Sequence, residues 1–269
     1  MVNHFSFISF GSGSSGNSYL IRTNEGQFLI DSGIGIRKIS RYFVEYGIHP
    51  KTLSAIFLTH DHSDHVKSAG QLSAKYDIPI YATAKTWKGI LNNPTIVMKA
   101  EVINHKTFVV GDVLHCCGCS LTTFSVPHDS NENVGYFIEY SGNHLCLITD
   151  AGHVTSSMCD YVSRANELIL ESNYDEDMLR TGSYPWPLKT RIQGENGHLS
   201  NNEAAEIVLK HFPHLNHVWL CHLSENNNTP QKAFDTIADC LRNNGIGQEE
   251  APKVVVLKRR TPSEFFDLS

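Results

Sequence analysis

The sequence lacks the features that mark specialised classes of protein. Charged residues make up only 19% of the chain, and it contains no long run of either sign, no low-complexity tract and no internal repeat. These absences describe an ordinary globular chain. A hydrophobic content of 41% in 269 residues is ample for a core, and nothing demands a second domain. We therefore expect one domain over residues 1–269.

Long hydrophobic runs and an excess of positive charge are also missing. No stretch reaches the length of a membrane span, and the first ten residues lack a basic leader and a small-residue cleavage site. We therefore expect a soluble, cytoplasmic protein without a membrane partner. The net charge of -6 gives no bulk attraction for nucleic acid. Any such partner must be held by a local patch or by bound metal ions.

The chain lacks an even set of cysteines, and the odd number of seven argues against a closed disulfide framework. Cys116, Cys117 and Cys119 lie together, but no second half of a zinc knuckle appears nearby. Isolated cysteines usually behave as small buried hydrophobes. We interpret this segment as a strand that turns through Gly118.

Histidine, by contrast, is abundant, and its densest group is Thr59-His60-Asp61-His62-Ser63-Asp64-His65. An apolar run of strand length directly precedes this motif. On an extended or tightly turning backbone, His60 and His62 project to the same side and can bind one ion. Asp64 and His65 lie one turn further on, where they can bind a second ion. The alternative, an exposed turn rich in histidine by chance, gives no reason to gather groups that are costly to pack.

Three more residues of the ligand type follow apolar runs later in the chain. They are His128, Asp150 and His222, each placed directly after an expected strand. The two oxygens of the Asp150 carboxylate suit it to bridge two ions. Alternation of strands and helices after an opening hairpin predicts an α/β fold. We expect one helix over residues 66–76, with its amino-terminal dipole facing the metals.

Two further segments have features that suit nucleic acid. Gly197-His198-Leu199-Ser200-Asn201 leads into an amphipathic helix, with Ser200 or Asn201 as its cap. Beyond Arg180 the chain is expected to be irregular. There Trp186 and Lys189 combine stacking surface with positive charge, the mixture that single-stranded nucleic acid requires. The alternative is a proline-rich lid that buries its aromatic residues.

Taken whole, the chain resembles the bacterial YycJ family, also called WalJ or VicX, of stand-alone metallo-β-lactamase-fold proteins. The segments that carry the resemblance span nearly the full length: FGSGSSGNSYL at residues 10–20, THDHSDH, SVPHD, ITDAGHV, ILESNYD, NGHLSN and CHLSENNN. The resemblance implies an αββα sandwich, with two mixed β-sheets flanked by helices. It also implies that Asp31 braces the histidine loop, for which a helix cap is the alternative.

The resemblance further implies the ligands of two divalent ions, Mn²⁺ or Zn²⁺. His60, His62 and His128 would hold one ion, Asp64, His65 and His222 the other, and Asp150 would bridge them. Members of the family are regarded as 5'-to-3' DNA exonucleases that prefer manganese, which implies the same activity here, with single-stranded DNA as partner. Mixed imidazole and carboxylate ligands suit both metals, so the sequence does not choose between them.

The mechanism expected from these motifs is attack on phosphorus by a hydroxide held between the two metals. Its catalytic residues would be Asp64, Asp150 and His198, with His198 holding the phosphate or protonating the leaving oxygen. Substrate contacts would come from His198, Ser200, Asn201, Trp186 and Lys189.

Two alternatives stay open at this point. One is a hydrolase of small thioesters, lactones or cyclic nucleotides, and the other is a metal-binding regulatory protein without turnover. An oxidative di-iron relative replaces an early histidine by a carboxylate, so His62 favours hydrolysis. The sequence does not decide the direction of cleavage, whether the substrate is DNA or RNA, or the oligomeric state.

Overall fold

The computed structural model describes residues 4–96 and 104–269, and these fall into two compact units. The first unit comprises Met1–Thr123, Ser130–Val134 and Lys258–Ser269, and the second comprises Phe124–Asp129 and Gly135–Leu257. The strand expected at residues 101–103 lies outside the described residues. That the whole chain forms one domain stays a prediction.

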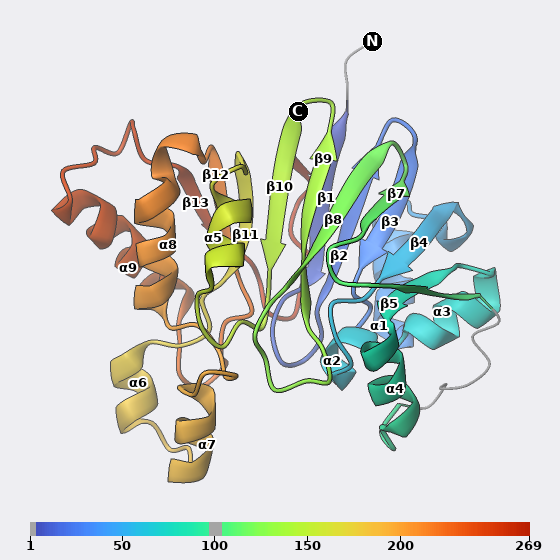
Figure 1. Ribbon diagram of the computed structural model, residues 1–269, viewed down its shortest axis with the longest axis horizontal. Coiled ribbons are helices and arrows are strands. Elements are labelled where there is room, and N and C mark those ends of the chain that lie inside the picture. Colours follow the sequence, from blue (N-terminus) through green and yellow to red (C-terminus); the bar gives the residue numbers. More distant parts are fainter. Residues whose placement is uncertain (1–3, 97–103) are drawn as a thin grey trace. The chain divides into compact units, whose positions relative to one another are not determined.

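A mixed sheet of seven described strands runs in the order β14-β1-β2-β3-β4-β5-β6 (Figure 1). Its strands are β1 (Phe5–Gly11), β2 (Ser18–Thr23), β3 (Gly26–Ile30), β4 (Leu53–Phe57), β5 (Ile80–Thr83), β6 (His105–Phe108) and β14 (Phe266–Asp267). The pairs β14–β1, β1–β2 and β2–β3 are antiparallel, whereas β3 through β6 pair in parallel. Because β3 and β4 are parallel, Asp31 and the histidine motif both follow strand ends on the same edge of the sheet.

Helices of the first unit are α1 (Ile36–Glu45), α2 (Ser63–Val66), α3 (Ala69–Tyr76) and α4 (Ala84–Asn92), with a 3₁₀ turn at Pro50–Thr52. The single helix expected over residues 66–76 is wrong, because the chain breaks between α2 and α3. The Ser68 amide donates to the Ser32 carbonyl at 2.8 Å, and the Asp64 carbonyl accepts from the Asn17 amide at 2.8 Å. These bonds replace the helical bond between residues 64 and 68. The four-residue α2 therefore carries little of the dipole that was expected to face the metals.

A second mixed sheet of seven described strands runs in the order β13-β12-β11-β10-β9-β8-β7 (Figure 1). Its strands are β7 (Val113–Cys116), β8 (Cys119–Ser125), β9 (Val134–Tyr140), β10 (Asn143–Ile148), β11 (Glu167–Glu171), β12 (His217–Cys221) and β13 (Lys253–Val256). β10, β11, β12 and β13 pair in parallel. All residues of β11 are buried, as parallel strands covered on both faces require. The carboxyl ends of these strands share one edge, where Asp150, Glu171 and His222 emerge.

Helices of the second unit are α5 (Ser156–Val162), α6 (Glu176–Thr181), α7 (Trp186–Ile192), α8 (Asn201–His211) and α9 (Pro230–Asn243), with a 3₁₀ turn at Phe212–His214. The expectation of an irregular segment beyond Arg180 is wrong, because residues 186–192 form α7. This helix has Pro185 as N-cap and Pro187 in its first turn. Proline is compatible with the first turn, where its missing N–H has no helical partner. Tyr174, Leu179 and Ile192 form a small core beneath α6 and α7. No helix in the described part of the chain is long and apolar enough to cross a membrane.

Gly33 allows the histidine motif to lie directly against the end of β3. A Cβ atom added at Gly33 would lie 1.6 Å from the Asp64 carbonyl oxygen, whereas one added at Gly35 would meet nothing within 4 Å. We expect Gly33→Ala to displace α2 and lower the free energy of unfolding by at least about 2 kcal/mol, measured by urea unfolding. Gly35→Ala is the matched control, with an expected change below about 0.5 kcal/mol. Equal stability of the two variants would contradict this close approach.

Candidate metal centre

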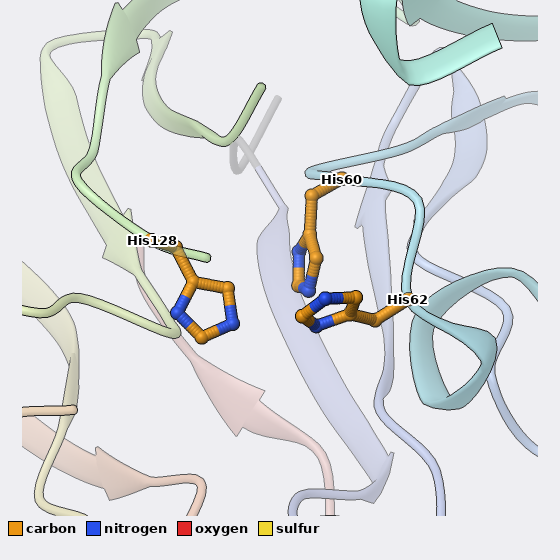
Figure 2. A group of neighbouring side chains, drawn as sticks. All are labelled: His60, His62 and His128. Carbon is orange, nitrogen blue, oxygen red and sulfur yellow. The ribbon is translucent and has the colours of Figure 1, made fainter. Parts of the chain in front are cut away.

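The first unit contributes four candidate ligands from the loop after β4 and from α2. Figure 2 shows His60 and His62 on this loop. His60 and His65 are completely buried, and their ring centroids lie 4.1 Å apart. The His60 and His62 centroids are separated by 4.7 Å, and Asp64 Oδ2 lies 3.7 Å from His65 Nε2. The structure thus brings together the four residues of this motif that the sequence predicted.

Asp31 holds this cluster in place from the end of β3. Its Oδ2 accepts from His65 Nδ1 at 2.7 Å and from the Thr59 hydroxyl at 2.9 Å, and its Oδ1 accepts from the Thr59 amide at 2.8 Å. Because Nδ1 donates to the carboxylate, Nε2 is the His65 nitrogen that can bind an ion. Burial raises the pKa of Asp31, and the neighbouring His65 opposes that rise. The predicted bracing role is confirmed. The alternative of a helix cap is wrong, since Gly35 caps α1.

Asn17 also contacts this cluster, and sequence reasoning assigned it no role. Its Oδ1 accepts from the Gly13 amide at 2.7 Å, which points Nδ2 toward the motif. Nδ2 lies 2.9 Å from His65 Nε2 and 3.4 Å from Asp64 Oδ2. Binding of an ion at His65 Nε2 therefore requires this amide to turn aside. The available signal was the run of glycine and serine over residues 11–18, here called the glycine-serine loop, which contains Asn17.

In the second unit, His128, Asp150 and His222 follow the ends of β8, β10 and β12. Asp150 Oδ1 lies 3.7 Å from His128 Nε2 and 3.3 Å from His222 Nδ1. His128 Nδ1 donates to the Gly197 carbonyl at 3.0 Å, so Nε2 is its ligand atom. Asp150 and His222 have left-handed backbones, with φ of 55° and 53°. Such strain in residues other than glycine is characteristic of functional sites.

Glu171 organises this second cluster and was missed from the sequence. One ligand atom each from Asp150, Glu171, His198 and His222 lies within 4.8 Å of the others. Glu171 Oε1 accepts from the Nδ1 atoms of His198 and His222, both at 2.8 Å. Its Oε2 accepts from the amides of Ala151 and Leu199. The signal was a carboxylate that ends the strand directly after the apolar residues 168–170.

The charge state of Glu171 follows from these contacts. Burial acts to raise the pKa of Glu171, but the charge of His198 and the hydrogen bonds from His198 and His222 outweigh it, and the pKa is lowered. Burial acts to lower the pKa of His198. The charge of Glu171 and its hydrogen bond to His198 outweigh burial, and the pKa of His198 is raised. His198 Nδ1 also lies 3.8 Å from Asp150 Oδ1. The structure therefore brings together His198 and Asp150, two of the predicted catalytic residues.

Ser200 and Asn201 are buried and have structural partners. The Ser200 hydroxyl accepts from the Glu203 amide, and the Ser200 amide donates to Glu203 Oε2 at 2.8 Å, which forms a capping box at the start of α8. Asn201 Oδ1 accepts from the Ser172 hydroxyl at 2.6 Å and from Asn228 Nδ2 at 2.8 Å. The expected cap is confirmed. The structure thus gives both side chains structural partners, and their predicted contacts with substrate stay a prediction.

Trp186 and Lys189 lie on α7. The Trp186 side chain is 76% exposed, so the alternative of a lid that buries this aromatic residue is wrong. Tyr184 does pack against the small core beneath α6 and α7. Lys189 Nζ donates to the Arg180 carbonyl at 2.8 Å. Stacking surface and positive charge therefore both occur on this short helix.

The cysteine cluster forms the hairpin expected from the sequence. β7 and β8 turn through Gly118, and Cys119 is buried while Cys116 and Cys117 are half-buried. Among the described residues, no group of potential metal ligands includes a cysteine. All cysteines in the described part of the chain are free thiols.

The donor atoms of both clusters fit divalent metal ions. His65, His128 and His222 each have Nδ1 on an oxygen acceptor, the arrangement that orients metal-binding imidazoles in proteins. Imidazole nitrogen together with carboxylate oxygen is a donor set that Zn²⁺ and Mn²⁺ accept. The chain thus carries histidine and aspartate clusters able to bind metal ions.

Comparison with known proteins decides the family. A model of the beta-lactamase superfamily domain matches residues 27–216, more than half of the chain. The chain is 35% identical over 263 residues to the exodeoxyribonuclease YycJ of Bacillus anthracis, covering 97% of this chain and 98% of that protein. It belongs to the YycJ/WalJ family of the metallo-β-lactamase superfamily. The exodeoxyribonuclease WalJ of Streptococcus pneumoniae is 33% identical over 90% of both chains.

Solved structures show the same fold. The metallo-β-lactamase fold protein YhfI of Bacillus subtilis matches with a TM-score of 0.71 and 17% identity, covering 98% of this chain and 99% of that one. The predicted fold class is thereby confirmed. As a member of the family, the protein is a metal-dependent hydrolase, which was also predicted.

Glu171 gives the clearest test of this site, because its carboxylate orients two imidazoles at once. We expect Glu171→Gln to weaken divalent-metal affinity about 10- to 100-fold, measured by titrating Mn²⁺ or Zn²⁺ into metal-stripped protein. The matched control is Glu167→Gln at the other end of β11, where Glu167 Oε2 accepts from His217 Nδ1 at 2.9 Å. This control should retain wild-type affinity. Equal affinities for both variants and the wild type would contradict the role of Glu171.

Proposed function

We propose that this protein is a two-metal phosphodiesterase that degrades single-stranded DNA from its 5' end. The observation that carries the proposal is the match to the YycJ exodeoxyribonuclease along nearly the whole of both chains. The second named exodeoxyribonuclease, WalJ, supports the same assignment. The choice of single-stranded DNA and the 5'-to-3' direction come from the family resemblance.

The proposed ligands are those that the sequence predicted. His60, His62 and His128, which Figure 2 labels, would hold one ion. Asp64, His65 and His222 would hold the second, and Asp150 would contact both. When bound, two such ions supply hydroxide from water near neutral pH and stabilise negative charge on a phosphate. Either Mn²⁺ or Zn²⁺ suits these ligands.

The chain's own residues would position the substrate and the ligands. Asp31 and Glu171 hold imidazoles by their Nδ1 atoms, so the rings are already oriented before substrate arrives. Glu171 also holds His198 by Nδ1, which makes Nε2 the atom of His198 that can reach a phosphate. We assign His198 to hold that phosphate or to donate a proton to the leaving oxygen. Trp186 would stack on a base, and Lys189 would contact the strand's phosphates.

The test is degradation of end-labelled single-stranded DNA by metal-stripped protein resupplied with Mn²⁺ or Zn²⁺. The wild type should release nucleotides stepwise, and a 5' label should appear first as a mononucleotide. Asp150→Ala and His62→Ala should each lose at least ~100-fold in turnover with the fold retained, because each removes a proposed ligand. Far-UV circular dichroism checks the fold of both variants.

Three outcomes would count against the proposal in different ways. Full activity in either variant would remove the two-metal scheme. Early release of a 3' label would reverse the direction. Failure to cleave DNA with either ion, while a thioester or lactone is hydrolysed, would favour a small-molecule hydrolase.

A further inference from the structure

A cavity of about 470 Å³ lies in the first unit, between the glycine-serine loop, the start of α1 and the segment that joins α2 to α3. Five of its lining residues carry polar or charged side chains that matter here: Ser15, Arg37, Lys38, Lys67 and Gln71. We call it the basic cavity. It includes none of the candidate metal ligands.

The charges of the basic cavity are of one sign. Arg37, Lys38 and Lys67 bring three cations, and none of the described lining residues is acidic. Lys38 Nζ donates to the Arg260 carbonyl at 2.6 Å, which leaves its charge uncompensated. The side chains of Arg37 and Lys67 form no hydrogen bond or ion pair with any residue that the structure describes. Gathered cations repel one another, and an anion bound among them would relieve that repulsion.

Lys85, a surface cation of the same unit, differs from these. It pairs with Glu132 at 2.9 Å. Ser15 and Gln71 add a hydroxyl and an amide, which can donate to oxygens of a bound anion. Arginine with lysine is the side-chain combination that proteins use most to bind phosphate. The chemistry of the basic cavity therefore favours a phosphate group.

The basic cavity is joined to the histidine motif by short stretches of chain. Lys67 comes two residues after His65, so their Cα atoms are at most about 7.6 Å apart. Ser15 comes two residues before Asn17, whose backbone amide donates to the Asp64 carbonyl at 2.8 Å. A phosphodiester strand bound at the histidine motif would thus have a neighbouring phosphate within reach of this cavity.

The net charge of the chain makes such a patch necessary. At -6, the protein as a whole repels a polyanion, so a nucleic-acid strand needs a local concentration of positive charge. Resting on the proposed nuclease function, we propose that the basic cavity binds a phosphate of the DNA strand next to the one cleaved. Arg37 and Lys67 supply the principal charges, and the ligand is either a backbone phosphate or the 5'-terminal phosphate.

The test measures binding of a fluorescent phosphorothioate oligonucleotide to metal-loaded protein across a range of salt concentrations. The double variant Arg37→Gln/Lys67→Gln should bind roughly tenfold more weakly at low salt, and the slope of log K against log salt should fall by about 0.7, the value for one phosphate contact on a single strand. The matched control is Lys75→Gln/Lys88→Gln, which removes the same charge from exposed lysines outside the cavity. It should lose less than twofold.

Oligonucleotides with a 5'-phosphate or a 5'-hydroxyl distinguish the two sources of the ligand. A loss confined to the 5'-phosphorylated strand assigns the cavity to the terminal phosphate, and an equal loss for both assigns it to a backbone phosphate. Equal affinity and slope for the cavity variant and the control would overturn the proposal. Metal content and the unfolding midpoint check that each variant is folded and loaded.

Cleavage of the ordinary oligonucleotide by the wild type separates this inference from the proposed function. If the wild type cleaves DNA while the cavity variant binds like the control, the basic cavity is excluded and the nuclease stands. If the wild type does not cleave DNA and the cavity variant still loses phosphate-dependent binding, the nuclease fails and the phosphate site stands.

Discussion

In each compact unit, the cluster of candidate ligands depends on one buried carboxylate that accepts a hydrogen bond from an imidazole Nδ1. Asp31, which follows β3, accepts from His65 Nδ1 at 2.7 Å. Glu171, the last residue of β11, accepts from His222 Nδ1 at 2.8 Å. Both carboxylates are completely buried. A buried carboxylate is costly unless it is hydrogen-bonded, and here each accepts several bonds that also fix the ring opposite. The same contacts therefore stabilise the fold and select Nε2 as the ligand atom.

The backbone around these carboxylates is held in conformations that few side chains adopt. Asp31, Asp150 and His222 all have φ between 53° and 59°, in the left-handed region. Each sits where a buried strand ends and the chain must turn its side chain along the sheet edge. Gly33 lets the motif approach within a distance that a Cβ would forbid. Strain of this kind persists because the packed strands behind it leave no alternative.

Much of this arrangement could be predicted from the sequence because ligands follow apolar strands. The positions of His60, Asp150 and His222 after strand ends follow from local patterns, and the structure confirms them. Glu171 was hidden because it belongs to the strand itself, and its partners His198 and His222 come from distant segments. The break between α2 and α3 depends on Asn17 and Ser32, which no local pattern reveals. α7 was missed because Pro185 and Pro187 suggested a loop. In the structure they are the N-cap and a first-turn residue, where proline is compatible with a helix.

Ser200 and Trp186 show what local sequence patterns leave open. A serine directly before a helix can cap that helix or contact a phosphate, and the sequence pattern is the same in both cases. Burial and the reciprocal bonds with Glu203 confirm Ser200 as a cap, and its contact with a phosphate stays a prediction. Trp186 shows the opposite case, since an aromatic residue between prolines proved to be exposed.

The most direct test of this account is anomalous diffraction from crystals of the manganese-loaded protein. We predict two anomalous peaks, with His65, His128 and His222 bound through Nε2 while Asp31 and Glu171 keep their bonds to Nδ1. A single peak, or coordination of His65 or His222 through Nδ1, would contradict the claim that these carboxylates orient the ligands of two ions.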